Sequence, residues 1–118
     1  MTNWYTNKEQ SIALSEFLPR DSANLYYPVF YNSKEGITGT EDTPIVNKDS
    51  YIEPEAIPCW SVEALLRVLP PIERRKPWLL LDCPCITYCG DNGFVMFGEN
   101  ILDACYKTII KLHQENYI

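Results

Sequence analysis

The sequence has little of what most enzymes and membrane proteins need. It is 118 residues long, holds a single histidine, and its longest run of large apolar residues, 78–81, is far too short to cross a bilayer. The glycine-rich phosphate loops, the Gly-x-Ser-x-Gly nucleophile turn and the His-Glu-x-x-His zinc motif do not occur. The common signatures of nucleotide-binding proteins and hydrolases are therefore missing, and a catalytic role is the less expected one.

Basic residues are also few. Ten lysines and arginines stand against sixteen aspartates and glutamates, which gives a net charge of −6. A general nucleic-acid-binding surface needs lysine and arginine to displace counterions from phosphates, so nucleic acid is not the expected ligand. The excess of negative charge is concentrated between residues 35 and 55, where Lys48 is the only basic residue, whereas 74–76 is a short basic run.

The first ten residues are polar and lack the apolar core of a secretory signal. The chain has five cysteines, an odd number, which favours reduced thiols over a disulfide framework. From these features we expect a soluble protein of the cytoplasm with no membrane partner.

Three segments carry the signals of short amphipathic helices, and the clearest lies between Ile57 and Pro70. Ser61 is a good N-cap for this helix, Trp60 can pack against Leu65 as a hydrophobic staple, and the proline pair 70–71 ends it. One stripe of the helix collects its apolar side chains, which are Val62, Leu65, Leu66 and Leu69.

The other two helices lie near the ends of the chain. Thr6 followed by Glu9 has the spacing of a capping box and predicts a helix over residues 7–18. Asn100 with Asp103 predicts a cap for a helix that runs to about residue 113. Their apolar faces are Leu14, Phe17 and Leu18 in the first helix, and Leu102, Cys105, Ile109 and Leu112 in the last.

Strand formers gather in two regions. Residues 78–82, 85–89 and 94–97 predict a three-stranded antiparallel meander, because residues 90–93 have the composition of a hairpin turn. Residues 25–31 predict a possible edge strand, since Pro28 cannot donate to a ladder.

Residues 32–58 predict a long acidic loop with room for a short strand at 44–46. The expected architecture is one small α+β domain over residues 1–118, in which about three helices pack on one face of an antiparallel sheet.

Three groups of residues occur in order along the chain: Asn7–Ser11 leading into Ser22–Tyr27, then Ile57–Arg67, then Leu102–Tyr106 through Lys111–His113. Together they resemble a family of small uncharacterised proteins encoded on prophages and other mobile elements of gut bacteria. The resemblance covers most of the chain, but residues 83–89 and the acidic loop depart from it. It implies a bacterial cytoplasmic setting and an accessory role, and it supplies no catalytic residues.

Cys83, Cys85 and Cys89 form the sharpest local constellation. Odd-numbered positions of an extended strand project to the same side, and thiolates are good zinc ligands. The fourth ligand would be Cys59, Cys105 or His113. The spacing lacks the paired Cys-x-x-Cys motifs of typical zinc sites. Small buried cysteines are the more common outcome of such a pattern, and zinc binding is the alternative.

Cys59 is the candidate nucleophile for a small cysteine-based enzyme. A thiol just before a helix N-terminus can have a lowered pKa, but its base would have to be His113, brought close by tertiary packing. The simpler interpretation is a small residue that leaves room for Trp60.

Aromatic residues are concentrated in the first half of the chain, and such residues are favoured at the centres of protein interfaces. Both sides of segment 25–31 are apolar, so one side can cover a partner. The candidate binding residues are Tyr26, Tyr27, Phe30, Tyr31 and Tyr51. The adjacent acidic loop could steer a basic partner toward them.

The leading hypothesis is therefore a non-catalytic protein-interaction or accessory protein of a phage or mobile element, with a host or element-encoded protein as its partner. A small cysteine-based enzyme or a zinc-binding protein is the alternative. A third hypothesis, that the acidic surface mimics DNA, is weaker, because the basic run 74–76 interrupts the negative field.

Overall fold

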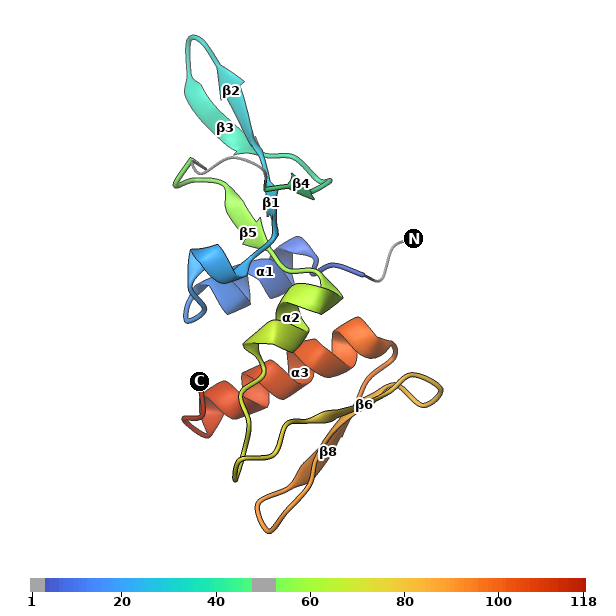
Figure 1. Cartoon of the computed structure of the whole chain (residues 1–118). Helices are drawn as coiled ribbons and strands as arrows, with labels where there is room; N and C mark the ends of the chain where they lie inside the picture. The colour runs from blue at the N-terminus through green and yellow to red at the C-terminus, as the bar shows by residue number, and fades with distance from the viewer. Residues whose placement is uncertain (1–3, 48–52) are drawn as a thin grey trace. The chain divides into compact units, whose positions relative to one another are not determined.

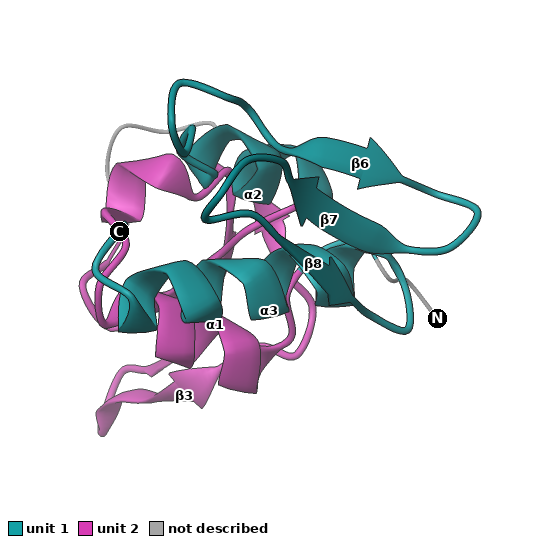
Figure 2. Cartoon of the chain, turned by 90° about the horizontal axis from the view of Figure 1, so that it is seen from below, with its two compact units in different colours: residues 1–5, 62–118 teal, residues 6–61 magenta. Residues whose placement is uncertain are grey.

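The computed structural model describes residues 4–47 and 53–118. Within them the chain forms three α-helices and antiparallel sheets of three, two and three strands, so the predicted α+β class is confirmed (Figure 1). The chain divides into two compact units, residues 6–61 and residues 1–5 with 62–118 (Figure 2). No helix in the described part combines the length and the apolar character that a membrane span requires.

Helix α1 (Lys8–Ser15) opens the unit 6–61, and its cap differs from the predicted one. The side chain of Asn7 accepts a hydrogen bond from the Gln10 amide, and the Gln10 side chain accepts one from the Asn7 amide. The capping box therefore lies one residue later than predicted. Thr6 does not cap because its hydroxyl is buried, where it shares a hydrogen bond of 2.7 Å with Ser11 and accepts one of 3.1 Å from the Trp60 amide. A short 3-10 turn, η1 (Arg20–Ser22), follows the helix.

Strand β1 (Leu25–Tyr27) is the central strand of its sheet, between β4 (Ile45–Val46) and β5 (Ile57–Cys59). The predicted edge position was wrong. Pro28 does not limit β1, because the strand ends at Tyr27 and the proline falls in the break before the next strand. The short strand predicted at 44–46 is confirmed as β4.

The acidic stretch after residue 28 is more ordered than predicted. Strand β2 (Val29–Asn32) continues the predicted strand segment 25–31, and it forms a two-stranded hairpin with β3 (Gly36–Thr40), which lies inside the predicted loop 32–58. Its turn is built by Gly36, with φ +78°, and by the Asn32 side chain, which accepts a hydrogen bond of 2.8 Å from the Lys34 amide. The sequence signal of β3 is weak because two of its five residues are glycines, so no apolar alternation marks it.

The other unit contains helix α2 (Val62–Val68), the strands β6 (Trp78–Leu80), β7 (Cys85–Tyr88) and β8 (Phe94–Phe97), and helix α3 (Ile101–Gln114). The predicted meander is confirmed, in the order β6-β7-β8. The cap of α3 is confirmed as well, since the Asn100 side chain accepts a hydrogen bond from the Asp103 amide at 2.9 Å. Helix α3 packs against α2 and against the sheet. Its predicted apolar face is buried: Leu102, Cys105, Ile109 and Leu112.

Candidate functional site

The predicted aromatic site is divided between core and surface. Tyr27 is only 2% exposed, and its hydroxyl donates a hydrogen bond of 2.7 Å to the carbonyl oxygen of Thr6. Tyr26 is half-buried, whereas Phe30 is 49% exposed and Tyr31 is 75% exposed. Tyr51 lies outside the described residues. Tyr27 is thus a core residue that cannot touch a partner, and the accessible part of the predicted set is on strand β2.

The hairpin β2–β3 exposes two adjacent aromatic rings, with an irregularity of the strand register between them. Tyr31 is paired in register with Ile37, which is also exposed. Phe30 is paired with Gly39, and a Cβ placed on that glycine would lie 3.9 Å from the Phe30 ring. The glycine therefore leaves space for the ring to lie against strand β3.

The base of the hairpin is held by Lys8 of α1. Its ammonium group donates to the carbonyl oxygen of Thr40 at 2.9 Å and to the carboxylate of Asp42 at 2.8 Å. The hydrogen bond and the charge of Lys8 hold the pKa of Asp42 below its usual value. This contact spans more than thirty residues of sequence, which no local pattern signals.

Cys59 lies in a closed polar network inside the unit 6–61. Its side chain is 0% exposed, its thiol donates to the carbonyl oxygen of Thr6 at 3.3 Å, and Trp60 beside it donates from its indole nitrogen to the hydroxyl of Ser22 at 2.9 Å. Burial raises the pKa of the Cys59 thiol. A protonated, inaccessible thiol is a poor nucleophile. This geometry therefore does not favour the hypothesis of a cysteine-based enzyme with Cys59 as its nucleophile.

The three cysteines proposed as zinc ligands have different surroundings. Cys83 is exposed, Cys85 is buried and Cys89 is half-buried. Across the described residues, no group of three or more histidines, cysteines or carboxylates is arranged to hold a metal ion. The structure does not bring these thiols together, and zinc stays a prediction that metal analysis of the purified protein would test.

The core cysteine of α3 is a structural residue. Cys105 is 0% exposed, and burial raises the pKa of its thiol to about 12. Tyr88 of β7 is also buried, which raises its pKa to about 12, and its hydroxyl donates a hydrogen bond of 2.8 Å to the carbonyl oxygen of Pro70. Both groups stay neutral in the core near neutral pH.

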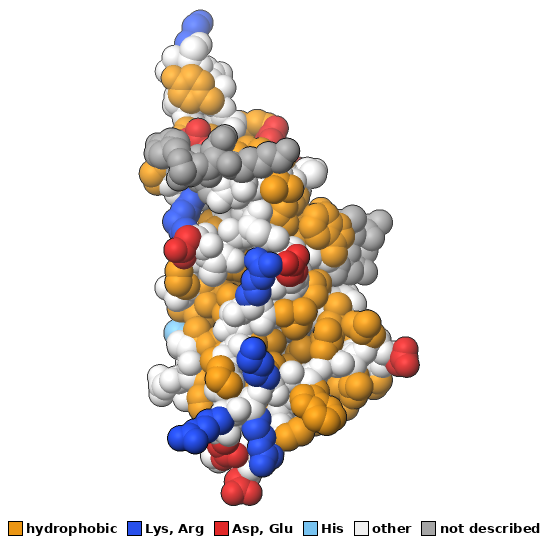
Figure 3. Space-filling view, viewed as in Figure 1, with side chains coloured by type: hydrophobic (Ala, Val, Ile, Leu, Met, Phe, Trp, Pro, Cys, Tyr) orange, Lys and Arg blue, Asp and Glu red, His pale blue; other side chains and the backbone are white. Residues whose placement is uncertain are grey.

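The structure shows a second apolar surface that we did not predict, the outward face of the sheet β6-β7-β8. Side chains alternate across a strand. Ile86 and Tyr88 are buried on the side of α3, and the ammonium group of Lys111 lies 5.0 Å from the Phe94 ring centre on the same side. The opposite face carries exposed apolar residues: Trp78, Leu80, Val95 and Phe97. Hydrophobic side chains gather over this part of the chain in Figure 3.

One signal in the sequence could have located this surface. Residues 78–81 are apolar at every position, with no alternation, although the helices were predicted to cover only one face of the sheet. A strand that is apolar on both faces needs a cover on both faces. In the structure it has one cover, and Trp78 is 68% exposed.

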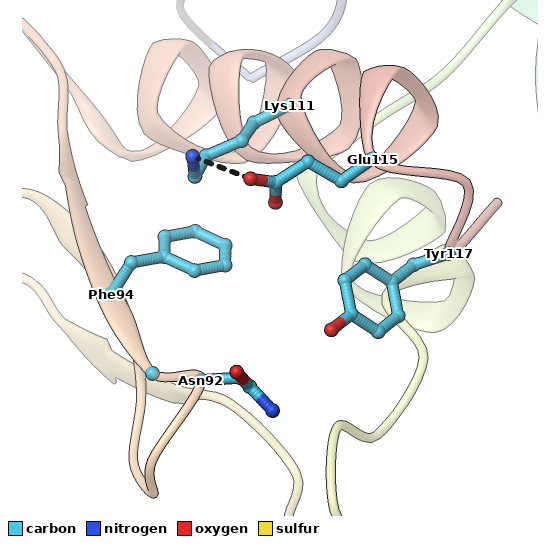
Figure 4. Close-up of a pocket in the computed structure, with 6 residues that line it drawn as sticks. Asn92, Phe94, Lys111, Glu115 and Tyr117 are labelled. Carbon is cyan, nitrogen blue, oxygen red and sulfur yellow. Dashed lines mark hydrogen bonds and ion pairs between the residues drawn. The ribbon is translucent and has the colours of Figure 1, made fainter.

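The described unit 62–118 has an open cavity of about 470 Å³ between the β7–β8 turn and the end of α3. Lys111 and Phe94 point toward one another in it, and Lys111 also makes an ion pair of 3.2 Å with Glu115 (Figure 4). Asn92 and Tyr117 complete the lining with neutral polar groups. The ammonium group of Lys111 in this cavity is therefore already paired with a carboxylate.

Comparison of the chain with protein-family models, with curated protein sequences and with solved structures gives no match.

Proposed function

We propose that this protein is a non-catalytic interaction protein that binds another protein through the hairpin β2–β3. The observation that carries the proposal is the exposure of Tyr31, whose ring projects from a paired strand with three quarters of its surface accessible. Tyrosine is enriched among the residues that dominate binding energy, because a large ring gives much contact area at little cost in conformational entropy.

The charges near the hairpin favour a basic partner. Exposed carboxylates lie in its turn, at Glu35, and later in the same unit before β5, at Glu53 and Glu55. The turn also carries the exposed cation Lys34. A partner that fits would offer an apolar pocket for the Tyr31 ring with lysine or arginine at its rim. Rim charges of this kind raise the association rate more than the affinity.

The resemblance to proteins of prophages and mobile elements supports a partner encoded by the bacterial host or by the element. An accessory role through binding also agrees with the buried, protonated state of Cys59 and Cys105.

The proposal is tested by capture followed by titration. Tagged full-length protein is used to capture partners from bacterial lysate, and the captured protein is then purified and titrated. We expect Tyr31→Ser to weaken binding by about thirtyfold, the effect of a typical interface hot spot of ~2 kcal/mol. The matched control is Tyr117→Ser, which removes an exposed tyrosine of the other unit and should leave the affinity unchanged.

Circular dichroism confirms that both variants are folded. Equal affinity of the parent, Tyr31→Ser and Phe30→Ser for the captured partner would refute the hairpin as the binding surface. A weakening by Tyr117→Ser equal to that of Tyr31→Ser would refute it as well, because the effect would then not be local.

A further inference from the structure

The edge of the sheet β6-β7-β8 is an unusual feature of the unit 62–118. Strand β6 ends the sheet, and within the described residues it is hydrogen-bonded to β7 alone. The free side of such a strand is a row of backbone donors and acceptors that can pair with another chain. Protein edges are commonly protected by charges within the strand or by a covering loop. Here Trp78, Leu79, Leu80 and the following Leu81 are all exposed.

We propose that β6 pairs with β6 of a second copy of this chain, antiparallel and about a two-fold axis at Leu79, which joins two three-stranded sheets into one of six strands. In this register Trp78 of each copy lies opposite Leu80 of the other. Directly opposite side chains of antiparallel strands are close enough for an aromatic ring to pack on an aliphatic group. Each copy thus covers part of the exposed apolar surface of the other.

In this register, the charged residues on either side of β6 in one copy complement those of the second copy. Lys76 lies just before β6 and Asp82 lies in the turn after it, so the axis at Leu79 brings Lys76 of one copy toward Asp82 of the other beyond each end of the ladder, and it produces this pair twice. Both residues are exposed in the single chain. Neither is among the residues that make an ion pair within the described chain. A basic residue before an apolar strand and an acidic one after it is the arrangement that favours antiparallel self-pairing.

Neighbouring registers fit less well. Moving the axis to Leu80 places the Trp78 ring opposite Asp82. Moving it to Trp78 places Pro77 opposite Leu79, inside the ladder, where proline has no N–H to donate. Pro77 therefore limits the pairing to a short ladder about Leu79.

The other edge of the sheet does not share this complementarity. If β8 paired with its own copy about Val95, Asp91 in the turn before β8 of one chain would come toward Glu99 after β8 of the other. Both are exposed carboxylates, and like charges directly opposite each other destabilise a strand pair. The self-pairing therefore belongs to β6.

The buried area sets the expected strength. Trp78 is 68% exposed and Leu81 66% exposed, and together with Leu79, Leu80 and the strand backbone the two copies would bury on the order of 1,000 Å². That is near the lower limit for a specific interface, so we expect a reversible dimer with a dissociation constant in the micromolar range.

Sedimentation equilibrium of the full chain over about 5–200 µM tests the proposal in a range around the expected constant. The parent should be a monomer–dimer mixture. Lys76→Asp alone and Asp82→Lys alone each place like charges opposite each other twice, and each should weaken dimerisation by about tenfold or more. An equimolar mixture of the two variants should dimerise again, because each substituted residue then faces the opposite charge of its partner.

Two controls separate this effect from net charge and from the hairpin. Lys34→Asp makes the same change of charge on the hairpin and should leave the dimer intact, as should Tyr31→Ser. A parent that is monomeric at 200 µM overturns the proposal. So does a mixture that associates no better than its two components, or a Lys34→Asp variant as weak as Lys76→Asp. Because the proposal concerns β6, its failure leaves the partner-binding role of the hairpin intact, and the reverse also holds.

Discussion

The hairpin β2–β3 and the sheet β6-β7-β8 both expose large apolar side chains, but for different structural reasons. The hairpin has only two strands, and both Phe30 and Tyr31 are exposed on it. The sheet has one face buried under α3 and one face open. The turn of the hairpin carries the charged residues Lys34 and Glu35, whereas the open face of the sheet carries exposed apolar side chains of β6 and β8 around Thr87.

This difference shows that aromatic content does not by itself locate a binding surface. Tyr27 and Tyr31 are four residues apart in one aromatic segment, yet the first is in the core and the second is on the surface. The position of each ring relative to a covering layer decides its role. Experiments on two residues of the same type, one buried and one exposed, therefore test directly which side chains belong to the core and which to the surface.

Thiol labelling should give the largest contrast. Cys83 is exposed, whereas Cys59 and Cys105 are 0% exposed, one in each unit. We expect iodoacetamide to label Cys83 at the rate of a free thiol and the two buried thiols at least ~10³-fold more slowly, because the protein must open first. Peptide mass spectrometry over time measures this. In urea all three should react alike, and rapid labelling of native Cys59 would instead support the cysteine-based enzyme.

A comparison of two tryptophans should give the next largest effect. Trp60 is 0% exposed and donates a hydrogen bond to Ser22, whereas Trp78 is 68% exposed. We expect Trp60→Ala to lower the free energy of unfolding by ~3–5 kcal/mol, because it leaves a large cavity. Trp78→Ala should change it by less than ~0.5 kcal/mol in the monomer. Urea unfolding of dilute protein measures both, and similar losses for the two variants would contradict the assignment of core and surface.

Two glycines of the hairpin should differ by a smaller amount. Gly36 has φ +78° with open space around its Cα, whereas Gly39 has ordinary backbone angles and room for a methyl group 3.9 Å from Phe30. We expect Gly36→Ala to cost ~1–2 kcal/mol through backbone strain alone, and Gly39→Ala to cost much less. Hydrogen exchange of the amides in residues 29–40 measures the loss locally. Equal protection in the two variants would show that the turn does not depend on Gly36.

Alkaline pH should produce the smallest of these effects. Burial raises the pKa of Cys105 from 9.0 to about 12, so the unfolded chain loses this proton at lower pH than the folded chain does. The resulting stabilisation is fully present below pH 9.0 and declines as the pH rises toward 12. At about pH 10 we expect Cys105 to account for a loss of about 1 kcal/mol relative to pH 8.

Urea unfolding at both pH values, compared with Cys105→Ala, isolates this contribution. The variant is less stable at either pH but should lose less stability between them. An identical decline in parent and variant would mean that the thiol of Cys105 ionises in the folded protein as it does in the unfolded one.

Most helices and strands followed from local patterns. The cap at Asn100, the pair of Glu63 with Arg67 on α2 and the turn at 90–93 each involve residues at most a few positions apart. The first capping box was misplaced by one residue, because Thr6 is drawn into a buried hydrogen bond with Trp60, more than fifty residues away. Of the predicted binding residues, Phe30 and Tyr31 are accessible. Tyr27 is buried in the core, where its hydroxyl donates a hydrogen bond to the carbonyl oxygen of Thr6.

Local patterns were enough to predict the α+β class, the meander of β6 to β8 and the limits of α3, because capping, apolar periodicity and turn chemistry act over a few neighbouring residues. The position of β1 between β4 and β5, the burial of Tyr27 and Cys59 and the exposed edge of β6 became apparent from the folded structure. These features depend on which distant segments come together in the fold. The local sequence of a strand that pairs on one side does not differ in pattern from that of a strand that pairs on both sides.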